Sequence, residues 1–154
     1  MGLPRPPVWQ LMLNMDAIGT PEEVYHRPAT TFVASFIGSP PMNLIKGQAD
    51  GSRFTAGGQT LALPVAAPRG GELILGLRPE HIELSQAGAT GWPLRVEALE
   101  MLGAERLVYG RLGDAQFIVR IDATLAPPRS GDTVSLQVAP AHLHWFDPGT
   151  QQRV

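Results

Sequence analysis

Apolar and polar residues alternate in short runs along most of the chain, and glycine, proline and aspartate separate the runs. Alternation with a period of two is typical of half-buried β-strands. Strands that recur at intervals of roughly 8–12 residues favour a mainly β fold, either a sandwich or a small barrel. The predicted strands are Met42–Gln48, Ser52–Thr55, Gln59–Leu63, Glu72–Leu77, Trp92–Leu102, Glu105–Leu112, Ala115–Ile121, Thr133–Val138 and His142–Phe146.

Two glycine-containing pairs lie between these strands and predict tight hairpin turns, namely Gly57-Gly58 and Gly113-Asp114. The first belongs to Thr55-Ala56-Gly57-Gly58-Gln59, which shares Gly-Gly-Gln with the phosphate-binding signature Leu-Ser-Gly-Gly-Gln of ABC ATPases. The leucine and serine of that signature are missing here, and β-like runs flank the glycines. We therefore interpret the segment as a turn.

A helical pattern precedes the strands. Thr20 at the N-cap, Pro21 at the first helical position and Glu23 at the third form a capping box, and Pro28 ends this short helix. A second short helix is predicted from Thr30 or Thr31 to Gly38, with one apolar face made of Phe32, Val33, Phe36 and Ile37. We place a boundary at Pro40-Pro41, so that residues 1–41 are a helical lead-in and residues 42–154 the body.

The composition narrows the possible functions. The chain has 154 residues, a net charge of -2, no cysteine and one lysine, Lys46. This length suits one domain of ordinary size. Lys46 is neither preceded by glycine nor followed by serine or threonine, as a phosphate-binding loop requires, so the chain does not hydrolyse nucleotides through such a loop. We expect no cofactor in this chain.

Charge and hydropathy exclude further classes of protein. Nucleic-acid binding depends on clustered Lys and Arg, whereas arginines here are scattered from Arg5 to Arg153. No apolar run approaches the roughly 20 residues of a membrane span, and the first residues lack the layout of a signal peptide. The absence of cysteine fits a reducing compartment, so we expect a cytoplasmic location without membrane insertion.

The densest group of polar residues follows a predicted strand, where Arg78, Glu80 and His81 surround Pro79. These side chains suit a structural salt bridge or a subunit interface, which we favour over an anion-binding site. His142 and His144 alternate on a predicted strand and would share one face. Two imidazoles alone do not make a zinc site, so we expect an exposed histidine pair. No catalytic or metal-binding constellation is evident, and we expect no enzyme activity.

Several motifs together resemble one protein family. Segments 18–29 and 32–43 are similar to the part of the chain that leaves the nucleotide-binding domain in ATPase subunits of bacterial sugar-type ABC importers, among them maltose and glycerol-3-phosphate importers. Leu75–Ile82 resembles the family motif Gly-x-Arg-Pro-Glu-His, and His142–Pro148 resembles a later strand. The motifs occur in the family's order and cover most of the chain from Ile18 onward.

The resemblance implies an oligonucleotide/oligosaccharide-binding-like (OB-like) barrel of short antiparallel strands, called a TOBE domain. In the family this C-terminal regulatory region helps to hold two ATPase subunits together and in some members receives regulatory proteins or small molecules. The phosphate loop, signature and other residues that serve ATP and Mg chemistry are absent from this sequence. The partners implied are a second copy of the chain, ABC permease subunits and regulatory proteins, at the inner face of the plasma membrane.

Our leading hypothesis is therefore a regulatory and dimerisation region of an ABC importer ATPase, without its ATPase domain. Arg78, Glu80 and His81 are the candidate interface or ligand corner, and Trp92 and Trp145 are candidate interface anchors, because tryptophan is enriched at binding hot spots. The alternative is a free-standing OB-like module that binds a small oxyanion or sugar.

Overall fold

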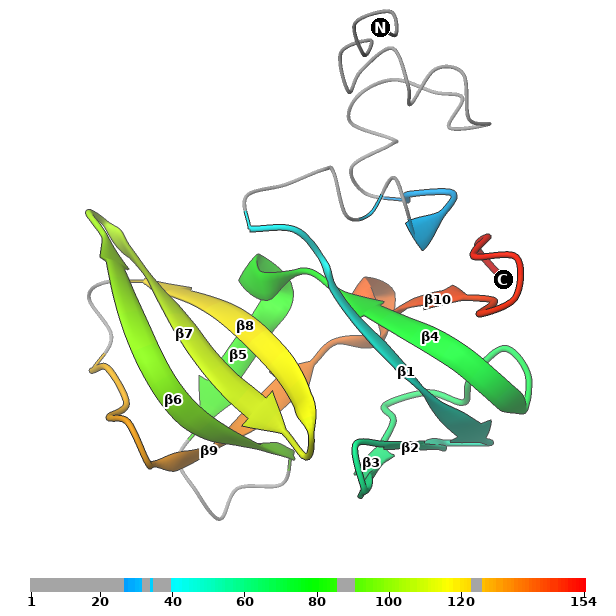
Figure 1. Ribbon diagram of the computed structural model, residues 1–154, viewed down its shortest axis with the longest axis horizontal. Coiled ribbons are helices and arrows are strands. Elements are labelled where there is room, and N and C mark those ends of the chain that lie inside the picture. The colour runs from blue at the N-terminus through cyan, green and yellow to red at the C-terminus, as the bar shows by residue number, and fades with distance from the viewer. Residues whose placement is uncertain (1–26, 32–33, 35–39, 86–90, 123–125) are drawn as a thin grey trace, which may run out of the picture.

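The computed structural model describes residues 27–31, 34, 40–85, 91–122 and 126–154. These residues form two antiparallel five-stranded sheets that lie side by side (Figure 1). The mainly β fold of short antiparallel strands predicted from the sequence is confirmed at this level.

The first sheet has the strand order β10-β4-β1-β2-β3. Its β2–β3 hairpin closes through Gly57 and Gly58, whose φ angles are +59° and +82°. Two consecutive positive φ angles match the right-handed twist of a hairpin and are accessible to glycine without strain, so the predicted turn is confirmed. The strands of this sheet are β1 (Asn43–Asp50), β2 (Arg53–Ala56), β3 (Gln59–Ala62), β4 (Gly71–Leu77) and β10 (His144–Phe146).

The second sheet has the order β5-β9-β6-β7-β8. Its long strand β6 carries an irregularity in register between Val96 and Ala98, and its two edge strands, β5 and β8, contact each other, so the sheet curls toward a barrel. The predicted Gly113-Asp114 turn joins β7 to β8 and is confirmed. The strands are β5 (Ile82–Ser85), β6 (Trp92–Leu102), β7 (Glu105–Leu112), β8 (Ala115–Asp122) and β9 (Thr133–Val138).

The chain crosses between the sheets through two short 3-10 helices of the same design. The helix η1 (Pro79–His81) connects β4 to β5, and η2 (Pro140–His142) connects β9 to β10. Each begins with a proline that follows an extended residue and ends with a histidine. Proline suits the first helical position, and it removes the N–H that a continuing strand would need.

One hydrophobic core fills the space between the sheets and draws on both of them, including Phe54, Leu75, Leu94 and Phe117. Polar contacts also join the sheets. The Asn43 side chain of β1 donates to the carbonyl oxygen of Ile118 at 2.8 Å and accepts the N–H of Ile118 at 2.9 Å. The Asn43 amide thus substitutes for a neighbouring strand on the outer edge of β8.

A third contact between the sheets is made by backbone alone. The N–H of Asp114 in the β7–β8 turn donates to the carbonyl oxygen of Gly57 in the β2–β3 turn at 3.1 Å. A Cβ atom built on Gly113 would collide with that same carbonyl oxygen. Glycine is therefore required at Gly113 for two reasons, namely the positive φ of +63° and the close approach of the other turn.

One strand of the structure was not predicted from the sequence, namely β5. The two short helices predicted before the barrel fall on residues 20–38, most of which lie outside the described residues, and no named α-helical element within the described part supports them. Of the second helix, Thr31 and Ala34 are described as helical, and the N–H of Ala34 donates to the carbonyl oxygen of Thr30 at 3.1 Å.

Candidate functional site

The predicted polar corner lies at the first crossover between the sheets, and its three side chains have different environments. Arg78 is 1% exposed and precedes η1, whereas Glu80 and His81 are half-buried. The N–H of His81 donates to the carbonyl oxygen of Arg78 at 3.0 Å, which closes the 3-10 turn. Arg78 therefore belongs to the interior of the domain, while Glu80 and His81 line its surface.

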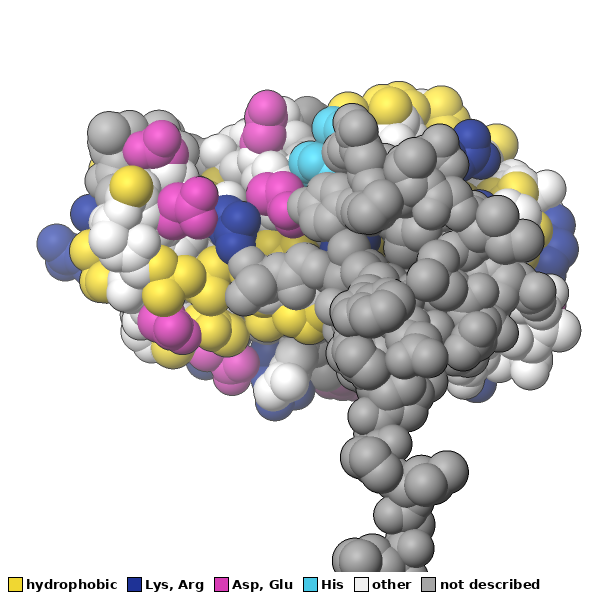
Figure 2. Space-filling view, turned by 90° about the horizontal axis from the view of Figure 1, so that it is seen from above, with side chains coloured by type: hydrophobic (Ala, Val, Ile, Leu, Met, Phe, Trp, Pro, Cys, Tyr) yellow, Lys and Arg dark blue, Asp and Glu magenta, His cyan; other side chains and the backbone are white. Residues whose placement is uncertain are grey.

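His81 stacks on His142 of the second crossover, with ring centroids 4.0 Å apart and an interplanar angle of 15°. The two rings border a shallow hollow of about 370 Å³, which is also lined by Glu80, Glu83 and Gln137. Figure 2 shows histidine side chains at the surface near acidic ones. The structure thus brings Glu80 and His81 together with residues of β5, β9 and η2, and the role of this corner as an interface or ligand site stays a prediction.

The prediction that His142 and His144 form an exposed pair on one strand is wrong. Pro140 begins a 3-10 turn that contains His142, and the strand β10 starts only at His144. His144 is 6% exposed, whereas His142 is half-buried against His81. Proline interrupts the two-residue period, so the two side chains do not share a strand face.

His144 is held neutral inside a positively charged neighbourhood. Burial is the main cause that lowers its pKa from 6.5 to about 4, and the charges of Arg153 and Arg78 lower it further. Its Nδ1 lies 2.9 Å from a guanidinium nitrogen of Arg153. Arginine can only donate, so Nδ1 accepts and the ring proton belongs on Nε2. The imidazole therefore acts as a buried acceptor that positions Arg153.

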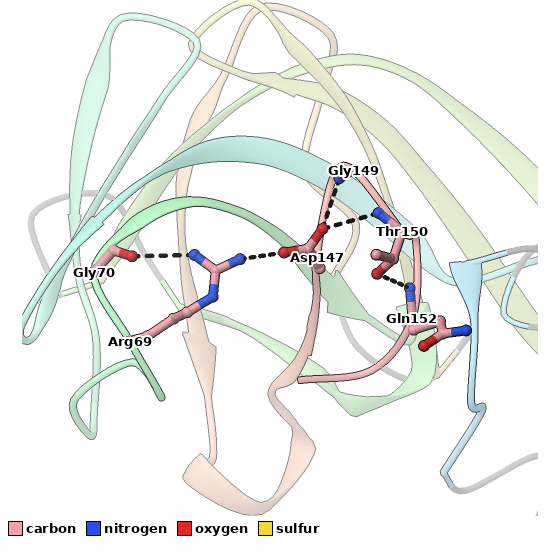
Figure 3. Close-up of polar contacts among 6 residues, drawn as sticks. All are labelled: Arg69, Gly70, Asp147, Gly149, Thr150 and Gln152. Atoms are coloured by element: carbon pink, nitrogen blue, oxygen red, sulfur yellow. Dashed lines mark hydrogen bonds and ion pairs between the residues drawn. The ribbon is translucent and has the colours of Figure 1, made fainter.

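The segment after β10 forms a compact turn around Asp147 (Figure 3). One carboxylate oxygen of Asp147 accepts the N–H groups of Gly149 at 2.8 Å and Thr150 at 2.9 Å, and the other contacts Arg69 at 2.6 Å. The Thr150 N–H, followed by that of Gly149 and by Arg69, lowers the pKa of Asp147 below its ordinary value of 3.8. The turn is therefore fixed at both oxygens of one carboxylate.

The residues after this turn, 151–153, are hydrogen-bonded to the segment that leads into the barrel. The N–H of Thr31 donates to the carbonyl oxygen of Gln151 at 2.9 Å, and the N–H of Arg153 donates to that of Ala29 at 2.7 Å. Gln151 has a φ of +61°, the only positive value among non-glycine residues in the described part of the chain. The boundary at Pro41 is untested, but the described residues before it are bonded to the body.

The two tryptophans proposed as interface anchors are both core residues. Trp92 is 5% exposed, and its indole N–H donates to the carbonyl oxygen of Ala62 at 2.8 Å, which ties β6 to the end of β3. Trp145 is 7% exposed and packs edge-to-face on Phe54 with centroids 5.3 Å apart. Their burial supports a role inside the domain, so a role between subunits stays a prediction.

Exposed apolar side chains gather instead at the tip of the β6–β7 hairpin. Met101 is 63% exposed and Leu102 is 42% exposed, and both precede the Gly103 turn. Glu105 lies opposite Leu102 in the β6–β7 register and pairs with Arg120 at 3.1 Å, so both signs of charge lie beside them. This surface was not predicted from the sequence, because Met101 and Leu102 extend the apolar–polar pattern of β6, whose first residues are alternately buried.

The repeat of Pro-x-His at positions 79–81 and 140–142 was a second missed signal. Two identical crossovers in one small barrel imply that their histidines meet, and the repeat could have been read from the sequence. No group of three or more metal-ligating side chains is present in the described ranges. Nor does any helix in those ranges reach the length and apolarity of a membrane span.

Two family models match this architecture. The TOBE domain model matches residues 75–146, and the model of the MalK OB fold domain matches residues 38–82. The two matches overlap at the first crossover and together span all of the described strands. The predicted similarity to the TOBE/OB-like region of sugar-type ABC importer ATP-binding subunits is thereby confirmed.

Similar full-length proteins point to one group of importers. The chain is 48% identical over 145 residues to the sn-glycerol-3-phosphate import ATP-binding protein UgpC of Salmonella typhi, covering 90% of this chain and 40% of that protein. It is 44% identical over 139 residues to UgpC of Cereibacter sphaeroides, covering 90% and 39%. The chain thus spans about two fifths of the length of these relatives.

A solved structure with the same fold is that of the cytoplasmic molybdate-binding protein ModG with molybdate bound. The TM-score is 0.52 and the sequence identity 16%, over 69% of this chain and 96% of that one. Identity at this level establishes a likeness of fold alone.

Proposed function

We propose that the chain works as the regulatory and dimerisation region of an ATP-binding subunit in a glycerol-3-phosphate or related sugar-type ABC importer. The observation that carries the proposal is the identity of 44–48% to UgpC proteins across 90% of the chain. The region itself would be no enzyme, because the residues that serve ATP chemistry in the family are not in this sequence.

The region would act through contacts between subunits. Two copies that dock symmetrically keep two ATP-binding domains near each other while those domains open and close. An effector that binds one arrangement better than the other shifts the equilibrium by its difference in affinity. The partners would be a second copy, the permease subunits and regulatory proteins, at the inner face of the plasma membrane.

The β6–β7 hairpin tip is the surface that fits such a dimer best. Met101 and Leu102 form an apolar centre, and the ion pair of Glu105 with Arg120 supplies both signs of charge beside it. A patch with an apolar centre and both charges at its rim can pair with a copy of itself across a two-fold axis. The proposal therefore predicts that the hairpin tip is buried in the dimer.

Light scattering over a concentration series tests this proposal. We expect a monomer–dimer equilibrium in the micromolar range, which the double variant Met101→Asp/Leu102→Asp weakens by about tenfold or more. Val65→Asp is the matched control, since Val65 is 45% exposed and lies on the loop between β3 and β4. A strict monomer at high micromolar concentration would contradict the proposal that the isolated chain dimerises. Equal effects of both variants on the dimer would contradict the assignment of the hairpin tip as the interface.

A further inference from the structure

A pocket of about 310 Å³ lies where the segment leading into the barrel meets the segment after β10. It is separate from the hollow beside His81 and His142, because no described residue lines both. The described residues that line it are polar or basic except for Ala29, namely Arg27, Ala29, Thr30, Gln152 and Arg153.

The walls of this pocket are held by the backbone. The bonds Thr31 N–H to Gln151 O and Arg153 N–H to Ala29 O connect the two segments on either side of it. The left-handed conformation of Gln151, directly before the lining residues Gln152 and Arg153, is costly for a side chain with a Cβ. Such conformations persist only where the surroundings enforce them, and they cluster at functional sites.

No carboxylate in the described part of the chain compensates the positive charge of the pocket. Arg153 is half-buried, and its guanidinium donates to the carbonyl oxygen of Pro28 at 3.0 Å, meets the neutral His144 ring at 2.9 Å and lies 5.5 Å from the ring centre of Phe146. None of these partners is an anion. Neither Arg27 nor Arg153 forms an ion pair with a carboxylate among the described residues.

The guanidinium groups of Arg27 and Arg153 also repel each other electrostatically. Burial is the main cause that lowers the pKa of Arg153, and the charge of Arg27 is the second cause. Two like charges at one partly enclosed pocket raise the local potential, and an anion bound between them would relieve it. Arginine forks match the oxygen geometry of phosphate and related oxyanions, to which they donate in pairs.

We propose that this pocket binds a small phosphate-class oxyanion, either inorganic phosphate or the phosphate group of a monoester, between Arg27 and Arg153. The volume of about 310 Å³ is at the lower end for pockets that hold organic ligands, so it admits an ester as well as the free ion. The hollow near His81 is a poorer place for an anion, since Glu80 and Glu83 line it. The inference does not depend on dimerisation and would hold for a free-standing module.

Isothermal titration calorimetry of the full chain with inorganic phosphate, glycerol 3-phosphate and uncharged maltose tests the proposal. We expect saturable binding of one or both phosphates and none of maltose. Tighter binding of inorganic phosphate would identify the free ion as the ligand, and tighter binding of glycerol 3-phosphate would identify the ester. Because the pocket is bordered by residues 28–31 and 151–153, the NMR amide shifts caused by phosphate should concentrate there.

The variant Arg27→Gln is the sharpest test, because Arg27 is exposed and its removal should leave the fold intact. It should weaken phosphate binding by about tenfold or more, as loss of one charge-assisted contact predicts. Arg53→Gln, on the exposed face of β2, makes the same change of net charge elsewhere and should alter the affinity by less than about twofold. No saturable binding at millimolar phosphate, or equal losses in both variants, would overturn the proposal.

Discussion

The two sheets are joined at two ends of the molecule, and the two joints are built differently (Figure 1). At one end the chain itself crosses twice, through η1 and η2, and the crossovers meet through the stacked rings of His81 and His142. At the other end the chain does not cross. There the turn at Gly57 contacts the turn at Gly113, and the indole of Trp92 reaches the backbone of Ala62.

The crossover end contains a group that titrates, whereas the turn end is held by the close packing of two backbone turns. The crossover end contains a neutral buried histidine, His144, close to Arg78 and Arg153, so protonation changes its energy. The turn end depends on the close approach of two backbones, which pH does not alter in the range where histidines titrate. The first joint can therefore respond to solution conditions or ligands, whereas the second fixes how the sheets are placed.

The largest expected effect comes from Gly113→Ala at the turn end. The new Cβ would collide with the carbonyl oxygen of Gly57 and also adopt a φ of +63°, so we expect a loss of about 2–5 kcal/mol in the free energy of unfolding. Gly103→Ala is a matched control with a φ of +66° and open space around it, and it should cost about 1–2 kcal/mol. Equal losses in urea denaturation would show that the turns do not support each other.

Acid should weaken the crossover end through His144. Because its pKa of about 4 in the folded chain is below the unfolded value of 6.5, the stabilisation is complete above pH 6.5 and disappears as pH falls toward 4. The contribution is on the order of 3 kcal/mol. His144→Asn should flatten this part of the stability profile measured by denaturation at several pH values. An unchanged slope in the variant would assign the acid sensitivity to other groups.

Trp92→Phe tests the polar contact at the turn end. The variant keeps an aromatic ring in the core but removes the donor to Ala62, and we expect a loss of about 1–3 kcal/mol. Hydrogen exchange should increase mainly in β3 and at the start of β6. A loss spread evenly over both sheets would indicate that the ring volume, rather than the hydrogen bond, carries the effect.

The smallest effect is expected from the turn around Asp147, next to the crossover end. Asp147→Asn removes the charge that pairs with Arg69, and Arg69→Gln removes the same pair while it leaves the bonds to Gly149 and Thr150. Because Arg69 is exposed and Asp147 only partly buried, both variants should leave global stability nearly unchanged. Asp147→Asn should accelerate amide exchange of Gly149 and Thr150 more than Arg69→Gln does, and the reverse order would contradict the assigned role of the carboxylate.

Strands were predictable where a buried face repeats every second residue over several positions. In β8 the residues Phe117, Val119 and Ile121 are buried, and the sequence shows the same alternation. In β5 only Ile82 and Leu84 alternate with polar residues, and the strand has only four positions. This short pattern directly follows the Arg78–His81 motif and was interpreted as part of it. A strand of four residues depends on its partner β9 for its identity, and pairing is not encoded locally.

The candidate site was only partly predictable for a related reason. The motif Arg78-Pro79-Glu80-His81 identified the first crossover, but its partner around Pro140 was interpreted as part of a strand, so the meeting of His81 with His142 was missed. The burial of Trp92 and Trp145 follows from tertiary packing rather than from residue type. The pocket between Arg27 and Arg153 joins residues far apart in the chain, and nothing in local sequence indicates that proximity.

The bonds between residues 28–31 and 151–153 have a topological consequence. Because the segments where the described fold starts and finishes lie side by side, the order of its strands along the polypeptide is not essential to their pairing. A short linker from Arg153 to Pro28, with new ends opened at Gly103-Ala104, would give a circular permutant with the same sheets. A Cβ built on Gly103 would meet no atom of the described residues within 4 Å, and such exposed tips tolerate new termini. The fold should therefore tolerate chain ends at a position other than the natural one.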